Sequence, residues 1–317
     1  MGSKKLWERT ERKKDDKLMP DPRETDLIIP IMGATGVGKS SFVNALLGEG
    51  SKEQAKVGHE LQSETAHLQH YVIPYPGLPD RRVIVVDTPG FDDTTEDDRE
   101  ILRRIAVWLA DSYSKEAKIA GVIYLYEITQ TRMLGTARKN LDMFKKLCGP
   151  KATKNTVLVT TKWSLIRTEV GISREKQLKH EHWKEIIQQG SKMFRLDQPP
   201  EGKTALEIVA EIMEPIISER LVAMALEIQT ELVKVEKLLA ETEAGRTLRY
   251  TLEELLENQK KMAQRLQTED GGEDVHRQVK DTDEKIQNTL EQLRALKIPW
   301  TRKFLGFFKL KRRSNSR

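Results

Sequence analysis

A glycine-rich segment near the start of the chain carries residue types that suit phosphate binding. Residues 33–40, Gly-Ala-Thr-Gly-Val-Gly-Lys-Ser, match the pattern G-x-x-x-x-G-K-[ST] between an apolar segment and an apolar helical pattern. Glycines let the backbone wrap a phosphate chain, and N–H groups at the start of the following helix supply a positive field. An ordinary glycine-rich turn is the alternative. The predicted nucleotide contacts here are Gly33, Ala34, Thr35, Gly36, Val37, Gly38, Lys39, Ser40 and Ser41.

Within this segment, two side chains have distinct expected roles. Lys39 would reach the β- and γ-phosphates of a nucleotide, and the Ser40 hydroxyl would bind Mg²⁺. A second group follows the apolar segment at 83–86, where the sequence reads Asp-Thr-Pro-Gly. Asp87 would hold Mg²⁺ through water, and the Gly90 N–H would contact the γ-phosphate; a helix-capping role for Asp87 is the alternative.

A hydroxyl between the two motifs is expected to complete the Mg²⁺ site. Thr65 is the predicted residue, and Ser51 and Ser63 compete for the role. The predicted catalytic residues are therefore Lys39, Thr65 and Gly90, and the predicted metal ligands are Ser40, Thr65 and Asp87.

A third group of polar residues, which would read the base, follows the apolar segment at 156–160. Guanine-specific proteins use the pattern [NT]-K-x-D, in which the aspartate accepts hydrogen bonds from N1 and N2 of guanine. Thr161 and Lys162 fit this pattern, but Ser164 stands in place of the aspartate and offers a weaker hydrogen bond. Trp163 would either stack on the base or pack in the core. Selectivity for guanine over adenine therefore stays open.

These residues require a sheet that brings strand ends together. Short apolar segments at 27–32, 83–86, 121–126 and 156–160 suit buried parallel strands, and the alternating pattern at 66–73 suits an edge strand. Helices are predicted in the intervening segments, at 39–48, 96–112, 136–147, 173–189 and 204–213. The fold class is therefore α/β, a mostly parallel sheet flanked by helices, as in a P-loop nucleotide-binding domain.

Beyond residue 218 the strand pattern ends and helical patterns follow. One heptad-like seam runs through Leu221, Met224, Ile228, Leu232, Val235 and Leu239. A second runs through Leu248, Leu252, Leu255, Met262 and Leu266, and a third through Val275, Val279, Ile286, Leu290, Leu293 and Leu296. Because glycines stand at 271 and 272, a helical hairpin or coiled coil is predicted. The residues before it, 219–244, would be free to contact the nucleotide-binding domain.

Charge divides the chain unevenly. The net charge of the 317 residues is +5, while residues 302–317 hold seven basic residues and no acidic one. This basic, aromatic tail is typical of contact with an anionic membrane. The alternatives are a disordered solubilising end, an apolar strip folded back on the helices with a nuclear-import-like basic cluster, or contact with nucleic acid. The nearly neutral body itself gives no reason to expect nucleic acid. The predicted divisions are a mobile extension at 1–25, a nucleotide-binding domain at 26–217, a helical arm at 218–298 and the tail at 299–317.

Composition excludes several other classes of protein. Cys148 is the single cysteine, so an internal disulfide is impossible, and no Cys/His spacing suggests a zinc site. The sequence shows neither a signal peptide nor an apolar segment of about 20 residues. A cytoplasmic protein is expected, with peripheral membrane contact through the tail.

The motifs together resemble septin-like and immunity-associated GTPases, and in particular fungal G-domain proteins with a C-terminal coiled coil. The resemblance rests on residues 33–41, 87–93 and 160–163 and spans roughly 27–260. It implies GTP, GDP and Mg²⁺ as ligands, slow hydrolysis of GTP, and a switch or assembly role with a homodimer formed through the G domain or the coiled coil.

The resemblance does not identify the residue that orients the attacking water molecule. Phe91 follows the Asp-Thr-Pro-Gly segment where Ras-like proteins have glutamine, and it cannot polarise water. The candidates for that role are His59, His67, Asp92 and Asp93. A nucleotide-stabilised scaffold with negligible turnover, or an ATPase with an altered base pocket, are the alternative functions.

Overall fold

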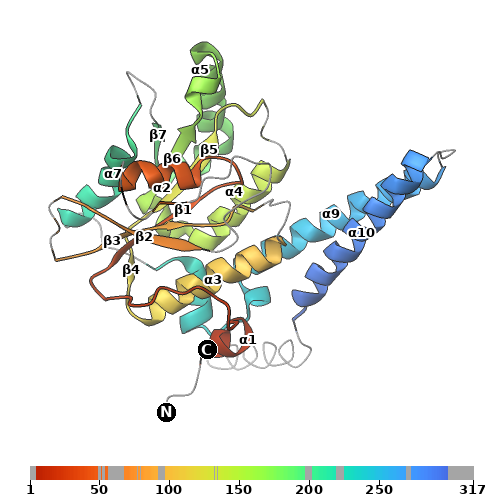
Figure 1. Ribbon diagram of the computed structural model, residues 1–317, viewed down its shortest axis with the longest axis horizontal. Coiled ribbons are helices and arrows are strands. Elements are labelled where there is room, and N and C mark those ends of the chain that lie inside the picture. The colour runs from red at the N-terminus through yellow and green to blue at the C-terminus, as the bar shows by residue number, and fades with distance from the viewer. Residues whose placement is uncertain are drawn as a thin grey trace, which may run out of the picture.

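The computed structural model describes residues 5–48, 51, 54–55, 68–76, 78, 80–91, 97–131, 133, 135–196, 202–218, 225–268 and 273–298. Its centre is a mostly parallel sheet in the strand order β2-β3-β1-β5-β6-β7, with the short β4 beside β1 (Figure 1). Among the strands that the structure describes, only β2 runs antiparallel, on the edge next to β3. The strands are β1 (Leu27–Met32), β2 (Gln69–Ile73), β3 (Val83–Asp87), β4 (Lys118–Ile119), β5 (Val122–Glu127), β6 (Thr156–Thr161) and β7 (Lys192–Arg195).

Helices cover both faces of this sheet, which confirms the predicted fold class. The side chains of β1 alternate: Ile29 packs with α2 (Lys39–Leu47) and α7 (Ala205–Ile217), while Ile28 packs with α3 (Asp98–Ser114) and α4 (Gly135–Cys148). The helix predicted at 173–189 is divided into α5 (Thr168–Gln177), a π-helical turn (Leu178–His182) and α6 (Lys184–Gln188). Both faces of the central strands are therefore buried, as in other parallel sheets.

The N-terminal segment is packed against the domain, so the prediction of a mobile extension at 1–25 is wrong for residues 5–25. Within α1 (Leu6–Thr10), Trp7 is 1% exposed, and Met19 further along is 3% exposed. Helix α1 contacts α3 and the segment at 230–234. The sequence pattern missed this because a few apolar side chains without helical or strand periodicity, Trp7, Leu18 and Met19, anchor an otherwise charged segment.

The first predicted heptad seam does not form one helix. Residues 226–241 instead form α8 (Glu227–Gln229), a π-helical turn (Thr230–Lys234) and a 3₁₀ turn (Leu239–Glu241). Ile228 and Leu232 are buried against the domain, but Val235 of the same seam is 59% exposed. The helical path stops at Glu236, whose φ of 52° is left-handed. Leu221 and Met224 lie outside the described residues.

The predicted helical hairpin is present. Helices α9 (Glu243–Thr268) and α10 (Glu273–Ala295) lie side by side and project from the body beside α3 and α4 (Figure 1). Leu252 and Leu266 of the second seam are buried, whereas Leu255 and Met262 are exposed. Among the described residues, none of the helices is both long and apolar enough to cross a membrane.

Candidate functional site

The glycine-rich loop lies between β1 and α2, at the carboxyl end of the sheet. Gly36 and Gly38 have φ values of 80° and 100°, which residues with a side chain rarely adopt. A Cβ at either position would meet no atom within 4 Å, so the conformation and not the space requires glycine there. Gly33 also has a positive φ, and a Cβ on it would lie 2.5 Å from the carbonyl oxygen of Leu125. The loop is thus held closely against β5 while its turn stays open.

Lys39 is the first residue of α2, and its long side chain folds back across this loop. The side chain is buried, and its ammonium donates to the carbonyl oxygens of Gly33 at 3.1 Å and Ala34 at 2.8 Å. The first turn of α2 contains no acidic residue. The positive end of the helix and the lysine charge therefore act at the same place, which favours an anion.

Asp87 ends β3 next to the start of α2. The Ser40 hydroxyl donates to its Oδ2 atom at 2.6 Å, whereas its Oδ1 atom is buried without a hydrogen-bond partner. Burial raises the pKa of Asp87, and the hydrogen bond from Ser40 and the charge of Lys39 lower it only in part. The site therefore contains a buried carboxylate with an unused acceptor atom.

Gly90 lies directly against the phosphate-loop residue Thr35. A Cβ on Gly90 would be 2.4 Å from the Thr35 nitrogen and 2.6 Å from its hydroxyl oxygen, so a larger residue would displace the loop. The Thr35 hydroxyl is itself buried without a partner. Thr88, two residues before Gly90, donates its hydroxyl proton to the carbonyl oxygen of Ile31 at 2.7 Å. The two motifs that the sequence separates are thus in contact.

Thr161 connects the segment predicted to read the base to the phosphate loop. Its hydroxyl donates to the carbonyl oxygen of Val37 at 2.8 Å and is buried. The next residue, Lys162, has a left-handed φ of 61° and forms an ion pair with Glu127 at the end of β5. The predicted base-contact residues therefore lie at the same sheet edge as Lys39 and Asp87.

Trp163 packs in the core, so base stacking is not its role here. Its ring is 3% exposed, and its indole N–H donates to the Thr160 hydroxyl at 3.0 Å. The guanidinium of Arg195 lies 4.6 Å from the ring centroid, and a Cβ on Gly171 of α5 would come within 2.5 Å of the ring. Both neighbours cover the ring surface that a base would need.

Several predicted residues cannot be placed. Thr65, its competitor Ser63 and the four candidates for water activation lie outside the described residues. Ser41 is exposed on α2, and Ser164 is exposed on the short turn Trp163–Leu165.

Sequence reasoning missed Glu127, although it is a charged residue directly after the predicted strand 121–126, a position comparable to that of Asp87.

The family model for the 50S ribosome-binding GTPases matches residues 28–162, which include the phosphate loop, Asp87 and Lys162. Residues 28–162 thus have the fold of a P-loop GTPase domain. GTP, GDP and Mg²⁺ are the ligands of such G domains. The residues assembled at the carboxyl edge of the sheet are consistent with these ligands.

Comparison with known proteins gives more distant similarities. Mouse guanylate-binding protein 5 is 31% identical over 74 residues, which are 23% of this chain and 12% of that protein. The chain thus matches only a small part of this relative. Among solved structures, Toc33 from Arabidopsis thaliana with Mg²⁺ and GMPPNP has a TM-score of 0.47 and 16% identity, covering 62% of this chain and 86% of the other. Era from Aquifex aeolicus has a TM-score of 0.38 and 16% identity, covering 61% and 56%.

Proposed function

We propose that the protein is a Mg²⁺-dependent GTP-binding protein that hydrolyses GTP slowly and acts as a nucleotide-controlled switch. The observation that carries this proposal is the buried Asp87 carboxylate, which is bonded to Ser40 beside Lys39 and has an unused oxygen. A buried carboxylate without full compensation is costly unless a cation or proton neutralises it. Its place at the phosphate loop suits a nucleotide-bound cation.

The residues present fit Mg²⁺. Asp87 and Ser40 offer a carboxylate and a hydroxyl oxygen, the hard ligands that Mg²⁺ prefers, and such sites keep several water molecules. Bound Mg²⁺ would neutralise charge on the β- and γ-phosphates. Lys39 would exchange its contacts with Gly33 and Ala34 for phosphate oxygens, while the loop amides orient the phosphate chain.

Slow turnover is proposed from the residue at position 91. The Phe91 side chain is 8% exposed and packs in the core, while its carbonyl oxygen accepts from the Asn140 amide at 3.3 Å. An apolar ring cannot orient an attacking water molecule, so hydrolysis would need another residue of this chain or of a partner. The scaffold alternative, in which turnover is negligible, follows from the same observation.

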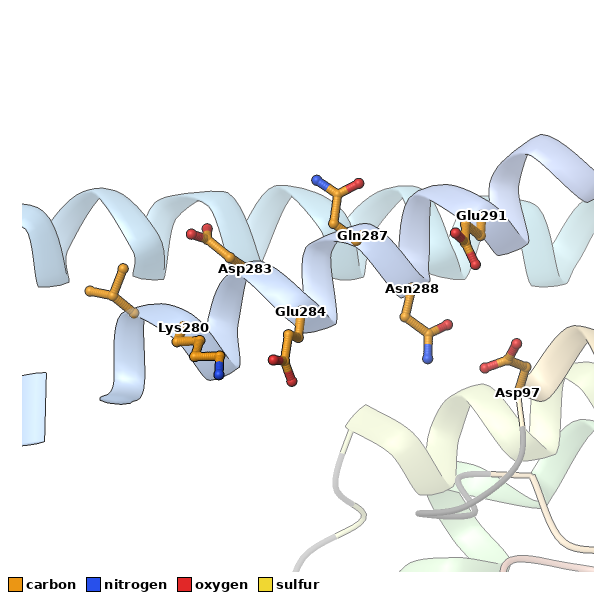
Figure 2. Close-up of a pocket in the computed structure, with 8 residues that line it drawn as sticks. Asp97, Lys280, Asp283, Glu284, Gln287, Asn288 and Glu291 are labelled. Carbon is orange, nitrogen blue, oxygen red and sulfur yellow. The ribbon is translucent and has the colours of Figure 1, made fainter. Parts of the chain in front are cut away.

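Contact between the arm and the start of α3 supports the switch role. Asp97, which precedes α3, accepts a hydrogen bond from the Gln292 amide of α10 at 3.2 Å. Figure 2 shows Asn288 and Glu291 of α10 on the side that faces Asp97. Because Asp97 follows the Asp87–Gly90 segment closely in sequence, a nucleotide-dependent shift there would reach the hairpin.

The test begins with the nucleotide content of natively purified protein, measured by chromatography. We expect GDP or GTP, and we expect fluorescent GDP to be displaced by GTP but not by ATP. Lys39→Ala should abolish both retention and binding, because it removes the positive charge in the loop. Displacement by ATP instead would favour the ATPase alternative.

Turnover and switching need two further measurements. Multiple-turnover phosphate release should exceed that of Lys39→Ala; equal rates with intact binding would favour the scaffold. Hydrogen exchange of α10 should differ between the GDP-bound and GMPPNP-bound protein if the arm responds to nucleotide. Identical exchange in both states would remove the switch.

Partner and location are proposed on the sequence alone. The tail at 299–317 lies outside the described residues, and its contact with anionic membranes stays a prediction, as do a cytoplasmic location, homodimerisation and the septin-like subtype. Flotation with liposomes containing anionic lipid, with and without residues 299–317, tests the membrane contact. Equal flotation of both forms would remove it.

A further inference from the structure

Guanine recognition needs a group that accepts two hydrogen bonds. The base presents N1–H and the N2 amino group on one edge, and a carboxylate can accept from both. Ser164, which stands where the sequence pattern has aspartate, is exposed on the turn Trp163–Leu165 and carries a single hydroxyl. If the protein binds guanine nucleotides, as proposed above, another acceptor at this edge has to take the role of the missing aspartate.

Glu127 is a carboxylate at this edge. It is the last residue of β5 and lies directly opposite Thr161 of β6, the residue whose hydroxyl bonds to Val37 in the phosphate loop. The Glu127 side chain is 15% exposed, so it is enclosed but can still be reached from solvent. Its Oε2 atom accepts from Lys162, and its Oε1 atom accepts from Gln130.

The backbone around Glu127 is held in place on both sides. The amide of Ile128 donates to the carbonyl oxygen of Thr161 at 3.0 Å, which continues the strand pairing beyond Glu127. Arg174 of α5 donates to the carbonyl oxygens of Ile128 at 3.0 Å and Thr129 at 2.6 Å. A carboxylate on such a fixed segment is suited to discrimination, because little conformational freedom is lost on binding.

Glu175 is also tied to this edge, but its surroundings differ. Both of its oxygens accept from Arg195, whose guanidinium covers the Trp163 ring. This paired arrangement clamps α5 to the end of β7 and leaves the carboxylate committed to arginine. Glu127, by contrast, accepts from the Lys162 ammonium and from the neutral Gln130 amide, and a base can replace that amide.

We propose that Glu127 is the residue that recognises the N1–H and N2 amino edge of guanine, with Lys162 holding its carboxylate at the base-binding edge of the sheet. On binding, the base donors would replace the Gln130 amide on the Glu127 carboxylate, while the Lys162 contact stays in place. Guanine specificity is thereby moved from the turn after β6 to the end of β5.

The experiment compares Glu127→Gln with wild type for binding of GDP, xanthosine diphosphate, inosine diphosphate and ADP in the presence of Mg²⁺. Glutamine offers one acceptor and one donor, so it no longer matches the two donors of guanine but matches the extra carbonyl of xanthine. We expect the affinity for GDP to fall at least about tenfold. The ratio of the affinity for GDP to that for xanthosine diphosphate should fall on the order of a hundredfold. The preference for GDP over inosine diphosphate, which lacks the N2 amino group, should also disappear.

Glu175→Gln is the matched control, because it removes a second carboxylate at the same edge and should leave all these preferences unchanged. If Glu127→Gln weakens the binding of all four nucleotides by the same factor, Glu127 only positions Lys162 and the proposal is overturned. Unchanged preferences would overturn it as well. Should Glu127→Gln not fold, Glu127→Asp, which withdraws the carboxylate by one methylene, is expected to lower GDP affinity selectively.

Failure of this inference is distinguishable from failure of the proposed function. Wild-type protein that does not prefer GDP over ADP would contradict guanine-nucleotide binding itself. Wild-type protein that prefers GDP, together with an unaltered preference in Glu127→Gln, would contradict only the assignment of Glu127.

Discussion

Asp87 and Arg103 are both about 1% exposed, yet the hydrogen bonds of Arg103 are complete and those of Asp87 are not. Arg103 of α3 donates to both carboxylate oxygens of Asp16, to both of Glu100 and to the carbonyl oxygen of Glu11. Asp87 accepts one hydrogen bond from Ser40, and its second oxygen has no partner.

We interpret this difference as that between a charge that holds the fold together and one that is kept for a ligand. Buried polar groups are normally hydrogen-bonded, because an unsatisfied one costs about 1–3 kcal/mol. The Arg103 guanidinium follows that rule, and its hydrogen bonds to Asp16 and to the Glu11 carbonyl oxygen fasten the N-terminal segment to α3. The unused atoms of Asp87 and Thr35 break it at the phosphate loop, where a ligand is expected to complete the hydrogen bonding.

The largest expected effect comes from breaking the saturated cluster. Arg103→Met removes the donors and leaves the carboxylates of Asp16 and Glu100 facing each other with less compensation. The free energy of unfolding should fall by about 3–5 kcal/mol, measured by chemical denaturation. Lys13→Met is the control, because Lys13 contacts Glu100 with a side chain that is 51% exposed, and its loss should cost less than about 1 kcal/mol. Equal losses would show that Arg103 is not special.

Asp87→Asn should have the contrasting outcome. The neutral amide keeps the shape of the side chain and removes a buried charge, so the nucleotide-free protein should unfold with an equal or higher free energy. Mg²⁺-dependent binding of GTP should weaken on the order of tenfold, measured by titration with and without Mg²⁺. A marked loss of stability would mean that Asp87 is part of the scaffold.

A smaller effect is expected from pH, with opposite signs at the two sites. Burial alone would raise the pKa of Glu100, but hydrogen bonds from Arg103 and Lys13 lower it from 4.5 to about 2. Its contribution to stability is therefore present above pH 4.5 and is lost as the pH falls towards 2. The pKa of Asp87 is raised above 3.8, so the charged side chain destabilises the folded protein at higher pH. This destabilisation is relieved as the pH falls towards 3.8, and the stability of the folded protein rises accordingly.

Denaturation at several pH values between 5 and 2 tests this opposition. Glu100→Gln should flatten the acid loss of stability relative to wild type, whereas Asp87→Asn should steepen it. The same slope in both variants would contradict the assignment of opposite shifts.

The phosphate-loop edge could be predicted because local pattern and chemistry agree there. The glycines allow the tight turn of the loop, and Lys39 and Asp87 place charges where a phosphate and a cation would bind, so backbone requirement and ligand chemistry predict the same site. Apolar segments marked the strands that bring these residues together. Trp163 could not be assigned in this way, since packing and stacking use the same side chain. Its place depends on Gly171 and Arg195, which are distant in sequence.

The helical region was harder because heptad spacing marks a buried face and not a continuous helix. Ile228 and Leu232 are buried as the seam suggested, but they face the domain. The chain then turns where Glu231, 2% exposed, accepts from the Lys237 ammonium at 2.5 Å and from the first amide of α9 at 3.1 Å. Contacts that one buried carboxylate makes to residues six and twelve positions further along the chain leave no periodic trace in the sequence.

Packing of the N-terminal segment on α3 has a practical consequence for fragments of this protein. Expressing residues 28–162 alone, the span of the family match, would remove Trp7 and Met19 together with Ile228 and Leu232. The side of α3 that these residues cover would then be bare and apolar, a surface that favours self-association. Insolubility of such a fragment would follow from the loss of the segments that cover α3. Nucleotide binding and hydrolysis should therefore be measured on protein that keeps the residues before 28 and after 162.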